Sequence, residues 1–545
     1  MKRRRLLKLA GAATASLLGS NDASLAAPVD ASSGPRGSIA AARAPLPVRM
    51  GYEMLGKGGN AIDAAVTAAL TAAIVQPSSC GAGGYGTHIT IARADGKVTC
   101  IDGNSMAPEA ARAGMFKVDE EGQVPGKGNY YGWLAAGIPG TLGGLQLALD
   151  RYGTKKFGDV AEAAIRLARD GVIVDKQMAA SFRGSADHFR NDPASKKLYF
   201  DGDEPLAEGA TYRNPDVAAL LEKLAERGTS DSFYRGDIGR QIAAGFQKHG
   251  GIATAEDFAA YRAKEVEPVE LSWRGYSMHT APITAGGAST LQALAVLKEL
   301  KWEGWKDTAR KNHAALESLR LAWADRFQTF GDMDHVDVPL ERLFSGGYIR
   351  ELAARVDAAV KAGRAIKQDF DSYEQRGTVH ISTADREGNL VALTLTHGGG
   401  FGARVTVEGL GVTLGHGISR FDPRPGRANS IGPRKRPLNN MTPTAVLRDG
   451  RPVLALGARG GRRIPNAVYS ALLKFVGEDR SMADSVAAPR MDTIGNMALV
   501  LDDAWNEGDT NVFKNLGFEI SRASVALLSA TSFDPRTGKT GASER

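Results

Sequence analysis

The stretch Gly377-Thr378-Val379-His380-Ile381-Ser382 opens a run of strand-like sequence after a charged and weakly patterned segment. Apolar and polar side chains alternate through it with the period of a half-buried strand. Turn residues follow at 385–389, and a second segment rich in Val, Leu and Thr runs from 390 to 396. A three-residue loop at 386–388, with glycine in the left-handed position, predicts a hairpin centred on Glu387.

In this register Thr378 lies directly opposite Thr396, so two hydroxyl groups face each other at the end of a sheet. The arrangement suits a threonine that is released as a new N-terminus and uses its own α-amine as the base. The hairpin by itself leaves a second interpretation open, in which both residues are ordinary strand threonines.

Several glycine- and proline-containing motifs follow one another along the rest of the chain. They are Gly58–Ala65 (GGNAIDAA), Gln76–Ser79, Gly81–Gly86, Gly137–Thr141, Arg427–Ile431, Lys435–Leu438, Met441–Thr444 and Leu456–Arg463. In order and spacing they resemble the gamma-glutamyltranspeptidase family, from about Gly51 to Phe475. The resemblance implies the four-layer α-β-β-α sandwich of the N-terminal nucleophile hydrolases, an α/β (α+β) fold. Helical and strand patterns alone predict only a mixed α and β protein.

The resemblance also implies a reaction. Thr378 would attack the carbonyl carbon of Gly377, cleave its own precursor, and then act as the nucleophile on an amide substrate. Thr396 matches the family's second threonine, which bonds to the nucleophile, and Gly460 and Gly461 match the glycines whose N–H groups hold the oxyanion. An α-amine has a reference pKa of about 7.7–8.0, so it accepts the hydroxyl proton near neutral pH. We expect no cofactor and no metal.

Four recognition positions depart from the family pattern. Asn104 stands where the family has an arginine in a D-x-R-E-x-A-P stretch, and Gly398 stands where it has an asparagine. Asn439 and Asn440 replace a pair of serines, and Arg420 replaces the acidic residue that takes the substrate ammonium. One position has therefore reversed its charge.

These departures predict an unusual acyl group. An arginine repels the ammonium that a carboxylate would attract. We therefore expect an acyl group with a carboxylate and no α-ammonium, held by Arg420, with Asn439, Asn440 and Asn104 as neutral partners. Relatives that cleave dicarboxylic monoamides, such as oxamate amidohydrolases and glutaryl-cephalosporin acylases, indicate that the fold accepts such groups. The alternative is that Arg420 points to solvent.

The chain is expected to have three parts. Residues 1–26 resemble a twin-arginine export signal, with Arg3-Arg4-Arg5-Leu6-Leu7-Lys8 before an apolar run, which predicts a periplasmic or secreted protein. Residues 27–377 would form a large subunit and residues 378–545 a small one, together a heterodimer. Positions 356–377 are charged and weakly patterned, as expected of a flexible linker before a cleavage point, although a surface helix fits them equally well.

Composition excludes several classes of function. The formal charge of +7 falls to about +3 without the signal, too weak for nucleic-acid binding, and no apolar stretch is long enough to span a membrane. Gly81–Gly86 satisfies G-x-G-x-x-G but precedes a strand, which argues against a dinucleotide site.

Cys80 and Cys100 are compatible with one disulfide. The expected hairpin places Cys100 opposite Ile91, so the sequence leaves open whether the two cysteines are bonded.

Two further functions remain. The first is a conventional γ-glutamyl transferase or glutathione hydrolase whose recognition residues come from elsewhere. The second is an inactive family member that serves as a periplasmic binding protein, which would not need Thr378, Thr396, Gly460 or Gly461.

Overall fold

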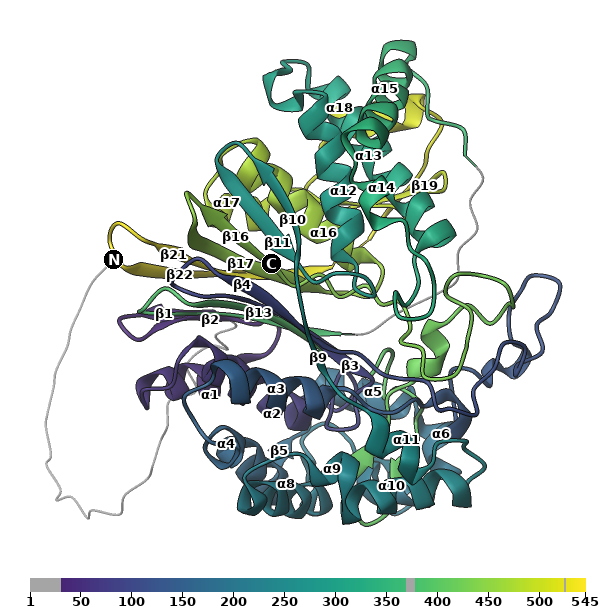
Figure 1. Ribbon diagram of the computed structural model, residues 1–545. Coiled ribbons are helices and arrows are strands. Elements are labelled where there is room, and N and C mark those ends of the chain that lie inside the picture. The colour runs from purple at the N-terminus through teal and green to yellow at the C-terminus, as the bar shows by residue number, and fades with distance from the viewer. Residues whose placement is uncertain (1–30, 369–377, 524–525) are drawn as a thin grey trace, which may run out of the picture.

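Two β-sheets are stacked face to face at the centre of the protein, and helices cover both outer faces (Figure 1). The computed structural model describes residues 31–368, 378–523 and 526–545. The expected export signal at 1–26 and Gly377 lie outside the described residues.

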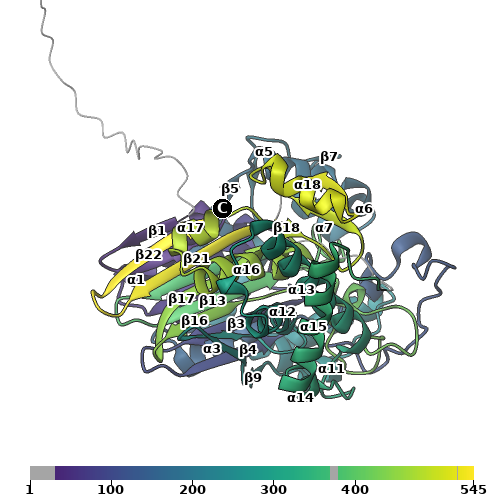
Figure 2. The same cartoon turned by 90° about the horizontal axis from the view of Figure 1, so that it is seen from above.

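The first sheet has seven strands, in the order β1 (Ala31–Gly34), β2 (Gly37–Ala40), β12 (Val379–Asp385), β13 (Leu390–Thr396), β3 (Gly86–Ala92), β4 (Val98–Gly103) and β9 (Lys264–Val266). The second has six, in the order β10 (Val269–Trp273), β11 (Tyr276–Thr280), β16 (Thr444–Arg448), β17 (Arg451–Arg459), β21 (Leu527–Asp534) and β22 (Lys539–Glu544). Strands of the two sheets run in roughly the same direction, and β22 packs over β1 and β2 (Figure 2).

One helical layer covers the first sheet and a second layer covers the other (Figure 1). The first contains α1 (Pro45–Gly56), α2 (Ala61–Val75), α3 (Thr141–Tyr152), α4 (Phe157–Asp170), α8 (Pro215–Arg227) and α10 (Asp237–Lys248). The second contains α12 (Gly287–Glu299), α13 (Thr308–Thr329), α15 (Gly346–Ala362) and α16 (Arg463–Leu472). The expected four-layer sandwich is confirmed.

Shorter elements complete the chain. The helices are α5 (Lys176–Arg183), α6 (Ala186–Arg190), α7 (Pro193–Tyr199), α9 (Ser232–Arg235), α11 (Ala255–Ala260), α14 (Leu340–Leu343), α17 (Met482–Ala487) and α18 (Glu507–Asn515). The strands are β5 (Val172–Ile173) with β8 (Thr211–Tyr212), β6 (Phe200–Asp201) with β7 (Glu204–Pro205), β14 (Thr406–Val407) with β15 (Val412–Thr413), and β18 (Met491–Asp492), β19 (Ala498–Leu501) and β20 (Glu519–Arg522).

The hairpin of β12 and β13 has the register that the sequence predicts. Val379 pairs with Leu395 and Ala384 with Leu390, and Gly388 has a φ of 94° in the connecting loop. Successive side chains of a strand point to opposite faces. Val379 therefore joins the core beneath the helices, while Ala384 joins the alanine-rich layer between the sheets. Both faces of this hairpin are buried, which holds its end firmly in place.

The N-terminus of α2 is attached to the far end of β12. Asn60 caps the helix, since its Oδ1 accepts from the backbone N–H of Asp63, whose own carboxylate accepts from Asn60 N. Thr383 Oγ1 donates to Ala61 O at 2.7 Å, and Ala61 N donates to Asp385 Oδ2 at 3.0 Å. These bonds position β12 against the helical layer.

One local prediction needs correction, and the disulfide that the sequence left open is absent from the described residues. Cys100 pairs with Thr90 and not with Ile91, because the β3–β4 loop has three residues with Gly96 at a φ of 85°, where a two-residue turn was expected. Cys80 and Cys100 are separate buried thiols, and burial raises the pKa of each to about 12.

The expected linker at 356–377 begins with helix. Residues 356–362 belong to α15, whose Val356 and Val360 are buried against α12 and α13. The surface-helix alternative is therefore right for this part, and residues 369–377 lie outside the described residues. Among the described residues, no helix combines the length and apolar character needed to cross a membrane.

Candidate active site

The predicted catalytic residues converge where several strands end at one edge of the sandwich. Thr378 directly precedes β12, and Thr396 ends β13, paired with Gly86 of β3. Continuing the β12–β13 register by one residue places Thr378 opposite Thr396. Both are buried, with 5% of Thr378 and 1% of Thr396 exposed to solvent. The two threonines therefore lie together, as the hairpin predicts.

The chain that follows Thr396 folds back over its hydroxyl group. Thr396 Oγ1 accepts a hydrogen bond from Gly398 N at 2.7 Å, and His397 N donates to Ser79 O at 2.8 Å. Gly398 has a φ of +101°, a conformation that favours glycine. The orientation of the Thr396 side chain is thus set by a backbone amide two residues away.

Gly460 and Gly461 connect the end of β17 to the start of α16. Their φ values are +142° and +66°, and a Cβ on Gly460 would lie 2.8 Å from the Cβ of Ala526. Both the backbone conformation and the close packing therefore require glycine at Gly460. The pair lies just before the N-terminus of a helix, where backbone N–H groups favour negative charge.

Arg420 is buried in a short 3₁₀ helix, Gly417–Arg420, and only 3% of it is exposed. Its Nη2 donates to Gly398 O and to His416 Nε2, the latter at 3.1 Å, and its guanidinium lies 5.5 Å from the ring centre of Tyr85. The alternative in which Arg420 points to solvent is therefore wrong. One residue, Gly398, connects Arg420 to the hydroxyl of Thr396, because its carbonyl oxygen accepts from Arg420 and its N–H donates to Thr396 Oγ1.

His416 is a neutral partner of Arg420. Burial, and secondarily the charge of Arg420, lower the pKa of His416 well below its usual value. Because a guanidinium only donates, Nε2 accepts, and Nδ1 donates to Tyr130 O at 3.1 Å. His416 was missed in the sequence, where its only signal is a position four residues before Arg420.

Gly398 leaves the space that these two side chains fill. A Cβ at this position would lie 2.5 Å from His416 Nε2 and 2.9 Å from Arg420 Nη2. An asparagine, which the family resemblance places here, would collide with both groups. The change to glycine and the change to arginine are therefore sterically linked.

The asparagines that replace the serine pair lie next to this site. Asn439 is fully buried; its Nδ2 donates to His88 Nε2 at 2.9 Å, and its Oδ1 accepts from Met441 N at 3.0 Å. Burial lowers the pKa of His88, so that its ring is neutral and Nε2 accepts. Asn440 is 7% exposed, and its carbonyl oxygen accepts from Thr442 Oγ1 at 3.1 Å.

Asn104 makes internal contacts on the same side. Its Nδ2 donates to Thr284 Oγ1 and to Pro437 O, both at 2.7 Å, and its Oδ1 accepts from Ser105 N at 2.9 Å. Both amide hydrogens are used inside the protein. Asn104 therefore stabilises the loop that carries the Asn439–Asn440 pair, and its amide has no hydrogen left to donate to a substrate.

Within the described ranges, no three His, Cys, Asp or Glu side chains come together in a way that could hold a metal ion. Hydroxyl groups and backbone amides lie at this edge together with buried guanidinium groups, which include Arg420 and Arg326, whose Nη2 donates to Asn439 O.

A four-layer α-β-β-α sandwich, with a threonine immediately before a central strand, is the fold of the N-terminal nucleophile hydrolases. Solved structures agree: a cephalosporin acylase from Bacillus halodurans matches with a TM-score of 0.84 at 24% identity, covering 97% of each chain. Helicobacter pylori gamma-glutamyltranspeptidase matches with a TM-score of 0.54 at 34% identity, covering 58% of this chain and 90% of that one.

The chain belongs to the gamma-glutamyltranspeptidase family, whose model matches residues 48–541. A glutathione hydrolase proenzyme of Escherichia coli (strain K12) is 35% identical over 458 residues, which cover 81% of this chain and 78% of the relative. The acylase ACY 1 proenzyme of a Pseudomonas species (strain SE83) is 32% identical over 521 residues, covering 94% and 92%. The protein is therefore similar to hydrolases and to acylases, both made as proenzymes.

Proposed function

We propose that this protein is an exported, self-processing amidohydrolase whose acyl group carries a carboxylate and no α-ammonium. The single observation that carries the proposal is the buried Arg420, which the backbone of one residue, Gly398, links to the hydroxyl of Thr396. Membership of a family with glutathione hydrolase and acylase relatives supports the reaction class.

The proposed reaction begins with self-cleavage. Thr378 Oγ1 attacks the carbonyl carbon of Gly377, the peptide nitrogen leaves as the α-amine of Thr378, and water hydrolyses the resulting ester into two chains. In turnover the α-amine takes the hydroxyl proton as Oγ1 attacks the substrate amide. That proton then goes to the departing amine, and water releases the acid from the acyl-threonine.

The remaining groups would stabilise this chemistry. Thr396 accepts from Gly398 N, which holds its hydroxyl toward the neighbouring strand. The N–H groups of Gly460 and Gly461 would bind the oxyanion, and loss of one such donor costs about 3–4 kcal/mol of transition-state stabilisation in a comparable enzyme.

Arg420 would select the acyl group by charge. A carboxylate would form charge-assisted hydrogen bonds with the guanidinium, whereas an α-ammonium would meet a like charge in a site shielded from water. The neutral His416 cannot compensate for that repulsion. Asn440, and the second amide hydrogen of the buried Asn439, would bind the acyl group through neutral hydrogen bonds.

Two other functions are weighed against this proposal. A conventional glutathione hydrolase is suggested by the E. coli relative, although Arg420 opposes the ammonium of a γ-glutamyl group. An inactive binding protein would have no need for the paired threonines and paired glycines.

The first experiment is the intact mass of the purified protein beside a Thr378→Ala variant. We expect two chains in the wild type, divided between Gly377 and Thr378, and one chain in the variant. A single chain in both would refute self-processing and favour the binding-protein alternative.

The second experiment compares the hydrolysis of glutaryl and γ-glutamyl 4-nitroanilides, which differ only in the α-ammonium. We expect the glutaryl substrate to have the higher kcat/KM. A clear preference for γ-glutamyl would reject the proposed acyl specificity and leave the conventional activity in its place.

Export is proposed from residues 1–26 alone. Cell fractionation of the full chain beside an Arg3→Lys/Arg4→Lys variant tests it. Retention of the variant in the cytoplasm is expected, and equal export of both proteins would contradict a twin-arginine route.

A further inference from the structure

A cavity lies at the lateral edge of the sandwich, where the chain crosses from one sheet to the other. β9 is the edge strand of the first sheet, β10 is the edge strand of the second, and residues 267–268 join them (Figure 1). The cavity beside this crossing has a volume of about 500 Å³. Pockets of about 300–1,000 Å³ with largely apolar walls are typical of small-molecule sites.

This cavity is separate from the proposed active site. Along the first sheet, β9 is the fourth strand from β12, which Thr378 directly precedes. Because neighbouring strands lie about 4.8 Å apart, roughly 19 Å separate β9 from β12. The described residues that line the cavity include none of those that we place at the acyl site or the oxyanion site.

Much of the cavity wall is apolar. The buried Ile283 belongs to a hydrophobic cluster against which Leu340 and Phe344 pack, and these two side chains are only partly buried. Met333, which is 48% exposed, lines the same cavity. A cavity of about 150 Å³ holds one benzene molecule, so this larger one has room for an apolar body of at least two rings.

Six acidic and two basic side chains also line the cavity. Both basic side chains are paired with acidic ones. Lys264 Nζ forms an ion pair with Asp334 Oδ2. Arg436 Nη1 lies 3.2 Å from Asp102 Oδ1. The two positive charges are therefore compensated inside the wall itself.

Four carboxylates remain after this pairing. Asp332 Oδ2 accepts from Arg436 N at 2.7 Å, and Glu270 Oε1 accepts from a nearby serine hydroxyl at 3.1 Å. Glu267 and Glu341 are exposed, and neither side chain has a hydrogen bond or ion pair with any residue that the structure describes. The cavity thus presents uncompensated negative charge next to an apolar wall.

We propose that this cavity binds an amphiphilic ammonium compound, with an apolar body of about two rings and one amine. The apolar body would cover Ile283, Met333 and Phe344, and the ammonium group would lie next to Glu267 and Glu341. An anionic ligand of the same shape would meet like charges there. The inference goes beyond the proposed function and does not depend on any reaction at Thr378.

The test uses three probes that share a naphthalene ring. They are 2-(1-naphthyl)ethylamine, which is cationic, 2-(1-naphthyl)ethanol, which is neutral, and 3-(1-naphthyl)propanoate, which is anionic. Calorimetric titration of the wild-type protein measures the Kd of each. One exposed charge pair strengthens binding by up to about fivefold, so with two carboxylates we expect the amine to bind about fivefold or more tightly than the alcohol. The propanoate should bind most weakly.

Three double variants identify the site. Glu267→Gln/Glu341→Gln should make the amine and the alcohol bind equally well, and Glu267→Lys/Glu341→Lys should make the propanoate bind most tightly. Glu53→Gln/Glu226→Gln is the matched control, because it removes the same charge from exposed positions on α1 and α8, in the other helical layer. It should keep the wild-type preference. All four glutamates are exposed, so these changes leave the core intact.

The possible results separate this cavity from other sites. Equal binding of the amine and the alcohol to the wild type, or binding of none of the probes, overturns the inference. A preference for the amine that survives in Glu267→Gln/Glu341→Gln also overturns it, because the amine would then be bound elsewhere on the protein. Loss of the preference in the control variant would indicate a general effect of net charge and would reject the site.

Discussion

Replacement of Arg420 by glutamine tests how the acyl group is selected. The side chain is buried and, in the proposal, forms a charge-assisted hydrogen bond with the acyl carboxylate. Such a bond is worth about 1.5–3 kcal/mol, so its loss lowers kcat/KM for a glutaryl amide about 10- to 150-fold. A γ-glutamyl amide loses an unfavourable charge contact at the same time. The ratio of the two kcat/KM values should therefore fall by at least tenfold.

The assay measures release of 4-nitroaniline from both substrates by processed enzyme, after intact mass has confirmed complete cleavage. Glutamine also weakens the bonds to Gly398 O and His416 Nε2, but that disturbance lowers both rates and cancels in the ratio. Arg420→Lys is the matched control, because it keeps the charge without the planar fork and should retain part of the preference. An unchanged ratio in fully processed Arg420→Gln would refute the reasoning.

Three further predictions concern the hairpin and its surroundings. Thr396→Val removes the acceptor that lies 2.7 Å from the buried amide of Gly398, and an unpaired buried amide costs about 1–3 kcal/mol. The kcat should therefore fall about tenfold or more, and it should recover in Thr396→Ser, which keeps the hydroxyl group. Gly457→Ala places a Cβ 2.2 Å from His380 Cε1, and such overpacking destabilises a protein by about 1–3 kcal/mol, so the Tm should fall. The Tm should recover in part in the double variant Gly457→Ala/His380→Ala, in which the histidine ring is removed. Burial lowers the pKa of His380 to about 3, so the unfolded chain binds the proton first as the pH falls below 6.5. Urea titrations measure the free energy of unfolding of the single-chain Thr378→Ala variant, with and without the additional change His380→Asn. Between pH 7 and pH 5 this free energy should drop by about 2 kcal/mol more in the protein that keeps His380. Equal drops would contradict the depressed pKa.

Local patterns in the sequence predicted the hairpin of β12 and β13, which carries Thr378 and Thr396 at its end. Alternation of side chains and a glycine-containing loop set the pairing of Val379 with Leu395, because a hairpin register depends on its turn and on which face is buried. The same reasoning was off by one residue at Cys100, where the loop has three residues and not two. The family resemblance then predicted the layers and the oxyanion role of Gly460 and Gly461, and it favoured Thr378 as nucleophile over the alternative of an ordinary strand threonine.

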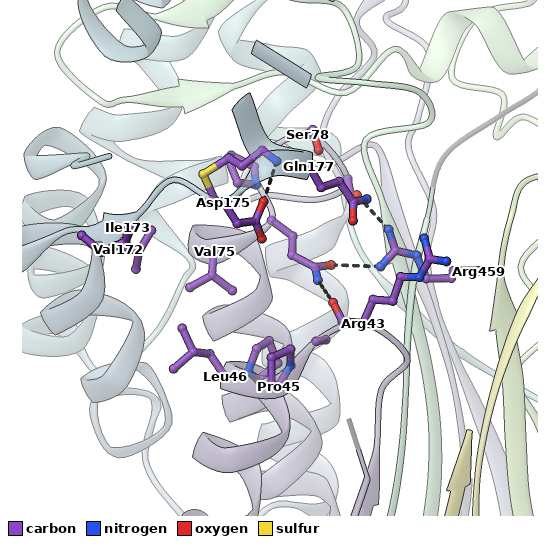
Figure 3. Close-up of a pocket in the computed structure, with 16 residues that line it drawn as sticks. Arg43, Pro45, Leu46, Val75, Ser78, Val172, Ile173, Asp175, Gln177 and Arg459 are labelled. Carbon is purple, nitrogen blue, oxygen red and sulfur yellow. Dashed lines mark hydrogen bonds between the residues drawn. The ribbon is translucent and has the colours of Figure 1, made fainter. Parts of the chain in front are cut away.

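The tertiary structure alone decided how the departures from the family pattern are used. Arg420 turns inward because Gly398, 22 positions earlier, leaves room for it and accepts its hydrogen bond. Asn104 is held by Pro437, 333 positions away, and so serves the loop and not the substrate. Gln76 joins Arg43 to Arg459, since its Nε2 donates to Arg43 O and its Oε1 accepts from Arg459 Nη1 (Figure 3). Local sequence determines the strands and their turns, whereas the direction of a buried polar side chain depends on which distant donors and acceptors the packed sheets bring within reach.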